Sequence, residues 1–541
     1  MTPVRPGRWW QEAVTYEVYV PSFSRGRAPD PARPFLPRGA AGAERLAGRV
    51  AGDLEGIRSR LEYLEWLGVD AIWLTPFYPS PLADFGYDVA DYCNVNPAFG
   101  TLADYDALLE DAHARGIRIV VDWVPNHSSD RHPWFVESRS GRDSLKRDWY
   151  IWRDGEPDRL PNNWRATFVD APAWSWDDTT GAWYLHLFLP EQPDINWANP
   201  EVEAAMTDVL RFWLDRGTDG FRIDVVHGIG KDPGLPDAPA DMAAVPWSAQ
   251  NDHESTHAII RRLRRVIDSY PGERFMVGEV FLLSTGKVAR YYGQDDELHL
   301  AFNFPPLFAP WDAGKWRHRI ERVEEELAPR QAWPTWVLSN HDVSRHRTRY
   351  GSEARARAAA VLLLTLRGAP YMYMGEELGL EDAAVPSDAV VDPGGRDGCR
   401  APIPWEEGPG HGWNGADRVL TWLPWPPDPD GRSVTAEQSD PGSTLQLYRR
   451  LLALRRSSPA LRLGSWEGLE APEGVLAYRR SHEGDARTVL VNYTGSERTV
   501  ALSGDPGPLV AQVSSAGAGE GQTFSGTLGP DEAVVLGRAG P

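Results

Sequence analysis

Eight short apolar segments alternate with amphipathic helical stretches, and this pattern predicts an α/β protein with a (β/α)8 TIM barrel. One unusually long connection predicts an inserted subdomain after the third strand. Short alternating segments near the end of the chain, separated by turn-forming residues, predict a C-terminal antiparallel β domain. The length of 541 residues agrees with several structural units, because a single hydrophobic core does not grow to that size.

The expected strands are apolar runs of five to seven residues. An open doubly wound sheet is the alternative arrangement for such a pattern. No glycine-rich phosphate-binding fingerprint supports that alternative, so the closed barrel is favoured. In chain order the expected strands are VTYEVYV (14–20), DAIWL (70–74), IRIVVD (117–122), GFRID (220–224), RFMVGE (274–279), LHLAFNF (298–304), TWVLSN (335–340) and PYMYM (370–374).

Several of the connecting helices have recognisable ends. Apolar residues over 54–64 mark one helical face, and Gly68 is expected to end that helix. A capping box that begins at Thr101 predicts the start of the next helix. Asn199 and Pro200 are typical of the N-cap and first position of another. Each helix leads into one of the expected strands, as a parallel barrel requires.

The spacing of these elements predicts the domain organisation. Residues 1–126 and 200–462 are expected to form the barrel in two parts. Residues 127–199, rich in Trp, Asp and Pro, are expected to fold as the inserted subdomain, and residues 375–441 as a long loop after the eighth strand. Residues 463–541 are expected to form a C-terminal β-sandwich domain.

Composition excludes several classes of function. The formal net charge of −21 would repel nucleic acid. No run of about 18 apolar residues is present, so we expect no membrane span, and the N-terminus lacks the apolar segment of a secretory signal. Cys93 and Cys399 are not spaced as metal ligands, which fits a reducing compartment. We therefore expect a cytoplasmic protein.

Four acidic residues stand at or just beyond the ends of expected strands: Asp122, Asp224, Glu279 and Asp342. In a (β/α)8 barrel, active sites lie at the C-terminal ends of the strands. One carboxylate in such a place is more often a structural cap, because an unpaired charge at the end of an apolar strand is costly. Four of them at the same end of one barrel predict a site that uses carboxylates.

A pair of carboxyl groups in different protonation states is what glycoside hydrolysis needs. Arg222 lies two residues before Asp224, so both side chains point to the same strand face, and the positive charge should favour ionised Asp224. Glu279 has no basic neighbour in the sequence, so burial and nearby carboxylates are expected to keep it protonated as an acid.

His127 and His341 also lie just beyond strand ends. Metal ligation is one interpretation of such a pair. Asn126 beside the first, and Asn340 and Asp342 around the second, favour hydrogen bonding to a polyhydroxy ligand instead.

The motifs at these positions resemble the α-amylase superfamily, glycoside hydrolase family 13. Its four signature regions are present in order as DWVPNH, GFRIDVVH, VGEV and SNHD, and the resemblance covers nearly the whole chain. Three further segments, EQPDINW, DFGYDVADY and GRDGCRAPIPW, resemble the α-glucosidase and oligo-1,6-glucosidase branch.

The resemblance implies a role for each site residue. Asp224 would be the nucleophile, Glu279 the general acid/base and Asp342 a third carboxylate that distorts or stabilises the sugar. The residues expected to bind substrate are Arg222, His127 and His341 as hydrogen-bonding partners, Tyr87 as a stacking ring, Asp84 and Arg400 as a pair over the 4-hydroxyl that closes the pocket, and Phe168, Phe188 and Gln192 as its lining.

The implied activity is that of an exo-acting retaining α-glucosidase on short α-glucosides. Oligo-1,6-glucosidase, transglucosylation and sucrose-type isomerisation or glucosyl transfer are alternatives, since all share a glucosyl-enzyme intermediate. A sugar-binding protein like the heavy chains of amino-acid transporters is a further alternative, but such chains carry a membrane span and lose catalytic residues. Val225, next to the nucleophile, is linked in this branch to α-1,6 cleavage, whereas VHGIGKD resembles α-glucosidases of broader linkage.

The chain departs from the family at one place. Many relatives carry an Asp-rich metal loop after the first strand, whereas residues 22–57 here lack that ligand spacing. We therefore expect neither a metal nor another cofactor.

This departure predicts that EDTA leaves hydrolytic activity and Tm unchanged. A protein stabilised by a bound ion would instead lose stability when the ion is removed. Thermal unfolding with and without EDTA measures the effect. A fall in Tm of several degrees that calcium reverses would contradict the prediction.

Overall fold

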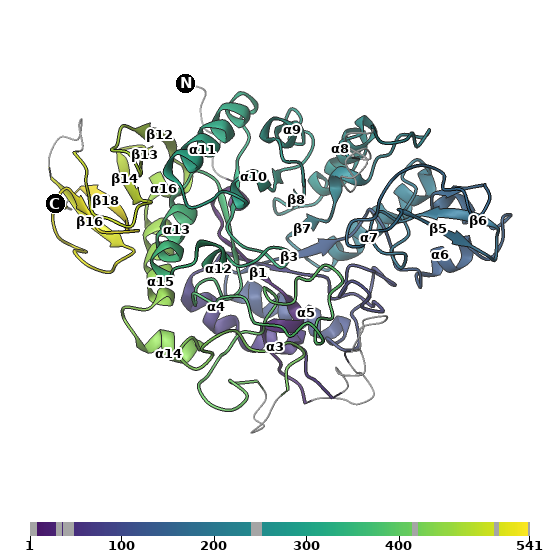
Figure 1. Cartoon of the computed structure of the whole chain (residues 1–541), viewed down its shortest axis with the longest axis horizontal. Helices are drawn as coiled ribbons and strands as arrows, with labels where there is room; N and C mark the ends of the chain where they lie inside the picture. Colours follow the sequence, from purple (N-terminus) through teal and green to yellow (C-terminus); the bar gives the residue numbers. More distant parts are fainter. Residues whose placement is uncertain are drawn as a thin grey trace.

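The computed structural model describes residues 8–28, 35, 48–239, 251–413, 420–501 and 508–538. Its centre is an eight-stranded sheet in the order β10-β11-β1-β2-β3-β7-β8-β9, in which every pairing is parallel (Figure 1). The predicted barrel and its eight predicted strands are confirmed. The strands are β1 (Thr15–Val18), β2 (Ala71–Leu74), β3 (Arg118–Trp123), β7 (Gly220–Ile223), β8 (Phe275–Gly278), β9 (Leu300–Ala301), β10 (Thr335–Val337) and β11 (Ala369–Tyr373).

A side chain bridges the seam between β9 and β10, where the described residues show no backbone ladder. The Thr335 hydroxyl donates to the Ala301 carbonyl at 2.8 Å, and the Asn303 N–H donates to the same hydroxyl at 3.3 Å. Thr335 is fully buried. The sheet is therefore a nearly closed barrel. Its two edge strands, β9 and β10, are joined by hydrogen bonds through the Thr335 hydroxyl.

Charged side chains enter the barrel from its strands. Glu17 on β1, Asp122 on β3 and Arg222 on β7 are all buried. Asp122 and Arg222 are register partners on neighbouring strands, so their side chains point to the same side of the sheet. Because buried charges need partners, this end of the barrel is organised around ion pairs.

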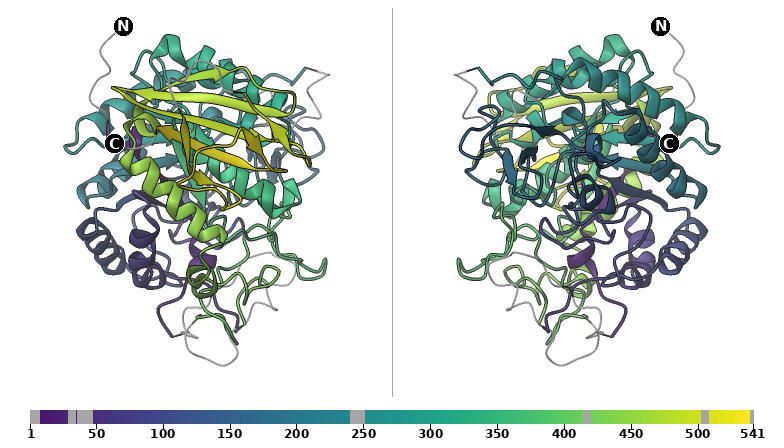
Figure 2. Two further views of the ribbon diagram at one scale, coloured as in Figure 1. Left: turned by 90° about the vertical axis from the view of Figure 1, so that its left-hand side faces the viewer. Right: turned by 90° about the vertical axis from the view of Figure 1, so that its right-hand side faces the viewer.

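The helices surround the sheet and begin where the sequence predicts (Figures 1 and 2). Thr101 and Asp104 form the capping box of α5, and Asn199 caps α7 with Pro200 at its first position. The expected helix over 54–64 is divided in two at Arg60, and Gly68 ends its second half with φ of 101°. The helices of the barrel are α1 (Trp9–Glu12), α2 (Val20–Phe23), α3 (Leu54–Ser59), α4 (Leu61–Leu67), α5 (Leu102–Ala114), α7 (Pro200–Asp215), η3 (Val226–Gly228), α8 (Glu254–Asp268), α9 (Thr285–Arg290), α10 (Phe304–Leu307), α11 (Ala313–Leu327), η4 (Ala328–Arg330), α12 (His346–Tyr350), α13 (Glu353–Thr365), α14 (Val434–Ser439), α15 (Thr444–Ser457) and α16 (Pro459–Leu463).

The connection between β3 and α7 contains a small antiparallel sheet in the order β4-β6-β5. Its apolar cluster includes Trp164, Trp174 and Phe188, and also Val225, the residue after Asp224. The subdomain is thus packed directly beside the end of β7. Its elements are α6 (Pro133–Ser138), η2 (Arg147–Trp149), β4 (Trp152–Arg153), β5 (Trp174–Asp177) and β6 (Ala182–Leu185).

An antiparallel sheet in the order β12-β13-β14-β18-β16 follows the barrel and packs against α13 and α15 (Figure 2, left). Arg480 ties it to the barrel, because its guanidinium donates to the carbonyls of Thr365 and Gly464. Among the described residues, no helix has the length and apolar character needed to cross a membrane. The strands are β12 (Ser465–Leu469), β13 (Val475–His482), β14 (Asp485–Asn492), β16 (Leu509–Ser514) and β18 (Ala533–Arg538), with a separate pair β15 (Arg498–Thr499) and β17 (Thr527–Leu528).

Candidate active site

The four acidic residues predicted from the sequence converge at the C-terminal end of the barrel. Asp122 lies in β3, Asp224 follows β7, Glu279 follows β8, and Asp342 lies beyond β10. Asp224, Glu279 and Asp342 line a cavity of about 430 Å³. Asp122 does not line this cavity and is fully buried. Asp224, Glu279 and Asp342 can therefore contact a ligand, whereas Asp122 contacts only other protein groups.

Arg222 connects three of these carboxylates. Its Nη1 donates to Asp224 Oδ1 at 2.6 Å and to Asp122 Oδ1 at 3.0 Å, and its Nη2 donates to Glu279 Oε2 at 2.7 Å. The guanidinium is buried. A planar group with donors on both terminal nitrogens fixes the direction as well as the position of its partners. Asp224 and Glu279 are therefore held side by side by one rigid group.

The remaining oxygen of each of these two carboxylates is available to a ligand. Glu279 Oε2 also accepts the backbone N–H of Val225 at 3.1 Å. Within the described residues, no donor reaches Oδ2 of Asp224 or Oε1 of Glu279. Each carboxylate is thus anchored through one oxygen and presents the other to the cavity.

Burial changes the expected ionisation of Asp224. Burial raises the pKa of Asp224 well above its usual range, and Glu279 and Asp122 act in the same direction, although Arg222 acts to lower it. The sequence argument included the guanidinium but not burial. The predicted contact between Arg222 and Asp224 is present, and the same guanidinium also contacts Glu279, which has no basic neighbour in the sequence. Burial likewise raises the pKa of Asp122, to about 6.

Asp342 is the carboxylate most strongly held in its ionised form. Burial acts to raise its pKa, but His341, Arg396 and Arg400 together hold that pKa well below its usual range. Arg396 Nη1 donates to Asp342 Oδ1 at 2.8 Å and Arg400 Nη2 to the same oxygen at 3.1 Å. Its side chain remains 30% exposed. Asp342 therefore presents a negative charge to the cavity at neutral pH.

His341 is neutral and is oriented from both sides. Burial lowers the pKa of His341 to about 3. Its Nδ1 lies 2.5 Å from Glu17 Oε1, and its Nε2 lies 2.7 Å from the Tyr87 hydroxyl, with the two rings stacked at 5.4 Å. Sequence reasoning missed Glu17. A single acidic residue inside the apolar run VTYEVYV was the signal that could have identified it.

His127 lines the cavity and takes part in a second chain of polar contacts. Burial lowers its pKa to about 4. Its Nε2 lies 3.1 Å from the Gln192 amide nitrogen, which also donates to Asp84 Oδ2 at 3.0 Å. The Phe188 ring lies 5.0 Å from the imidazole. Residues of the inserted subdomain and of the loop after β2 are thereby joined along one wall.

Asp84 pairs with Arg396 and not with Arg400, so the predicted pairing is wrong. Arg396 Nη2 donates to Asp84 Oδ1 at 2.6 Å, and Phe168 covers the guanidinium at 4.3 Å. Arg400 is fully buried and does not line the cavity. The two arginines stand four residues apart in GRDGCR, and the spacing alone does not tell which of them faces the cavity.

Arg400 is directed to the protein instead. Its Nε donates to the His341 carbonyl at 2.8 Å, and its Nη1 donates to Asp392 Oδ1 at 3.2 Å. It therefore fixes the segment that carries His341 and Asp342 from behind.

The chain is similar to proteins of a known family over most of its length. The model of the α-amylase catalytic domain matches residues 17–464. This chain belongs to the α-amylase family. A probable α-glucosidase of Rhizobium meliloti (strain 1021) is 39% identical over 531 residues, with 91% of each chain covered. An oligo-1,6-glucosidase of Parageobacillus thermoglucosidasius is 32% identical over 540 residues, again with 91% of each chain covered.

A solved structure of a trehalulose synthase from Pseudomonas mesoacidophila MX-45 is similar over nearly the whole chain. It has a TM-score of 0.87 and 30% identity, and the match covers 98% of this chain and 100% of the other. A trehalulose synthase thus shares the architecture of this chain.

Three phenylalanine rings, which sequence reasoning missed, form the cavity wall beside Glu279. The Phe281 ring lies 4.8 Å from Phe304 and 6.1 Å from Phe308, and all three line the cavity. Phe308 is 43% exposed. Aromatic residues in runs such as LAFNFPPLF are also typical of a core, so no sequence signal distinguished these rings.

Val225 has an unusual backbone conformation directly after Asp224. Its φ of 43° and ψ of 37° lie in the left-handed region, which a β-branched residue rarely adopts. Such strain costs on the order of 1–3 kcal/mol and persists where the surroundings impose it. Here the conformation coincides with donation of the Val225 N–H to Glu279 Oε2.

Residues 22–57 stand where some α-amylase family members carry a metal loop. Part of this range lies outside the described residues. Within the described residues, no group of three or more His, Cys, Asp or Glu side chains is arranged to hold a metal ion. The sequence-based prediction that the protein binds no metal stays a prediction.

Proposed function

We propose that this α-amylase family member is an exo-acting retaining α-glucosidase. It releases terminal α-glucose from di- and short oligosaccharides through a covalent glucosyl-enzyme intermediate and needs no cofactor. The proposal assigns the nucleophile to Asp224, the general acid/base to Glu279 and electrostatic stabilisation to Asp342.

The observation that carries this proposal is the bridge made by Arg222. Inverting enzymes separate their two carboxyl groups by about 6.5–9.5 Å to admit a water molecule, whereas a retaining pair is only about 5–5.5 Å apart. One guanidinium donates to both Asp224 and Glu279, which favours the closer spacing. The free oxygen of each carboxylate supplies the group that must touch the substrate.

In the first step, Asp224 acts as a carboxylate whose charge is balanced by its ion pair with Arg222, and its Oδ2 attacks the anomeric carbon of the terminal glucose. Glu279 gives the proton on Oε1 to the glycosidic oxygen, the bond from that oxygen to the anomeric carbon breaks, and the alcohol leaves. The product is a β-linked ester of glucose with Asp224. The negative charge of Asp342 stabilises the positive charge that develops on the sugar ring.

In the second step, the Glu279 carboxylate removes a proton from water, and the resulting hydroxide attacks the anomeric carbon. The ester bond breaks and Asp224 is released as a carboxylate. Two inversions leave glucose in the α-configuration. A sugar hydroxyl in place of water would give transglucosylation.

Two features support exo-action. Asp84, Arg396 and Phe168 form one side of the cavity from three separate segments. On the side of Glu279 the cavity is lined by Phe281 and Phe308, and Phe308 is exposed. We therefore place the terminal glucose against Asp84 and Arg396, and the leaving group along the aromatic wall.

The names of relatives leave oligo-1,6-glucosidase action and sucrose-type isomerisation as alternative activities. Val225, which lines the cavity, is the residue that this branch of the family links to α-1,6 cleavage. One apolar contact of this kind is worth only about 1–3 kcal/mol. We therefore propose mixed linkage tolerance with a preference for disaccharides.

The chemistry predicts different substrate dependence for two variants. Asp224→Asn should abolish activity toward both maltose and 4-nitrophenyl α-glucoside. Glu279→Gln should lower kcat/KM for maltose by about 10²–10⁴-fold, the usual contribution of a general acid, and far less for the nitrophenyl glucoside, whose leaving group needs little protonation. Equal losses of Glu279→Gln on both substrates would contradict the assignment of Glu279.

The contacts of Arg396 with Asp84 and Asp342 predict the effect of replacing this arginine. Arg396→Gln should lower kcat/KM for maltose by about 100-fold, as misplaced positioning groups do, because Asp84 and Asp342 both lose a partner. Arg322 is an exposed arginine on α11, and Arg322→Gln is the control that should leave kcat/KM unchanged.

Viscometry on soluble starch tests exo-action directly. Rapid viscosity loss with the unmodified enzyme would show that chains are cut internally.

A further inference from the structure

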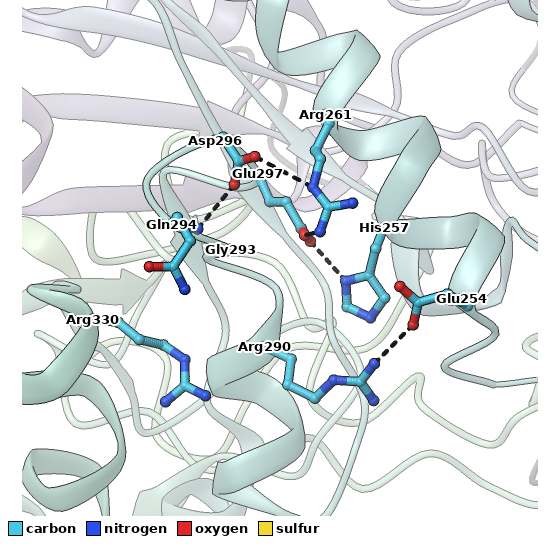
Figure 3. A pocket seen from close by; sticks show the side chains of 9 residues that line it. All are labelled: Glu254, His257, Arg261, Arg290, Gly293, Gln294, Asp296, Glu297 and Arg330. Carbon is cyan, nitrogen blue, oxygen red and sulfur yellow. Dashed lines mark hydrogen bonds and ion pairs between the residues drawn. The ribbon is translucent and has the colours of Figure 1, made fainter.

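An ion-pair chain lies outside the barrel, and its members His257, Arg261, Arg290 and Glu297 line a pocket that consists mainly of charged residues (Figure 3). His257 on α8 lies at its centre. Its Nδ1 is 2.7 Å from Glu297 Oε2, and its Nε2 is 3.5 Å from Asp252 Oδ1. His257 and Glu297 are both buried. Burial acts to lower the pKa of His257, but these two carboxylates raise it to about 9. The ring is therefore an imidazolium at neutral pH.

The two carboxylates are held in turn from other elements. Arg261, also on α8, donates to Glu297 Oε1 at 2.7 Å (Figure 3). Arg290 at the end of α9 donates to Asp252 Oδ2 at 3.3 Å. His257 is thus the central cation of a network that joins α8, α9 and the segment before β9. Removal of one partner from a buried ion pair strongly destabilises a protein, so the buried His257–Glu297 pair helps to hold these elements together.

The network leads from Asp252 to the proposed acid/base. Asp252 has a φ of 61°, and its N–H donates to the His227 carbonyl at 2.9 Å. The His227 ring places Nδ1 3.0 Å from the carbonyl oxygen of Glu279. His227 is fully buried. Two short contacts therefore connect the Asp252 turn to the backbone of Glu279.

The backbone of Glu279 needs such support because β8 ends one residue earlier. The Glu279 N–H still donates to the Ile223 carbonyl at 2.8 Å, as in the strand ladder. Its carbonyl has passed the end of the ladder, and the His227 ring is the partner that the described residues give it. The orientation of the Glu279 peptide, and with it the direction of its side chain, thus depends on where His227 lies.

We propose that His257 is a positioning residue for Glu279. The imidazolium between Asp252 and Glu297 fixes the Asp252 turn, that turn holds His227, and His227 holds the Glu279 peptide so that Oε1 points at the glycosidic oxygen. The inference rests on the proposed function, in which Glu279 is the general acid/base.

This role has a signature that a merely structural role lacks. Misplacement of the acid lowers kcat/KM only for substrates whose leaving group must be protonated, because kcat/KM reports the glycosylation step and not the later attack of water. His257→Gln should lower kcat/KM for maltose by about tenfold, less than the roughly 100-fold of a 1 Å misplacement, while kcat/KM for 4-nitrophenyl α-glucoside changes less than twofold. Asp252→Asn, which keeps the shape of the side chain and removes its charge, should show the same split. It replaces His257→Gln if that variant does not fold.

His113→Gln is the matched control. His113 Nε2 lies 2.7 Å from buried Asp219 at the opposite end of the barrel, away from the cavity. Its loss should affect both substrates equally or not at all. The His257→Gln change is also made in the Glu279→Gln background, where a residue that acts through Glu279 should cost less than twofold on maltose.

Two results would overturn the inference: equal losses of His257→Gln on the two substrates, or a further tenfold loss in the Glu279→Gln background. Failure of the proposed function is distinguishable from both. If Glu279→Gln alone retains full activity toward maltose, Glu279 is not the acid, whatever the His257 variant does.

Discussion

The contact on which the site depends is the bridge from Arg222 to Asp122, Asp224 and Glu279. Three carboxylates at the end of one barrel would repel one another, and burial would drive them to the neutral form. A single guanidinium opposes both effects and fixes one oxygen of each proposed catalytic carboxylate. The other oxygen of Asp224 and Glu279 is left to the substrate. Charge balance and catalytic geometry are thus set by the same group.

A second group of guanidinium contacts supports the side of the cavity where we propose that the sugar binds. Arg396 joins Asp84 to Asp342, and Arg400 holds the His341 segment from behind. These charges come from loops after different strands, so the barrel brings together what the sequence separates. Groups that are already held in place need not reorganise when charge develops in the transition state, which is why such sites lower barriers effectively.

The sequence predicted the barrel well because its strands and helices carry strong local signals. The hydrophobic periods, the capping box at Thr101 and the Asn199–Pro200 helix start need no tertiary information. The carboxylates were found for the same reason, since a charged residue at the end of an apolar strand is visible in one dimension.

What the sequence did not predict depends on the direction of side chains in space. Arg396 and Arg400 have equal chemistry and lie four residues apart, yet only Arg396 faces the cavity. Glu17 lies within an apolar run that predicts only a strand, and Phe304 and Phe308 are residues of a type that is equally common in a hydrophobic core. The pKa of Asp224 depends on burial, which a local pattern of charges does not contain.

The central claim is that Asp224 and Glu279 form a retaining pair, and the configuration of the first product tests it most directly. Proton NMR during the first minutes of maltose hydrolysis distinguishes the anomers before they equilibrate. The account predicts that the glucose released from the non-reducing end appears as the α-anomer. Initial release of the β-anomer would show a single inversion and would contradict the account.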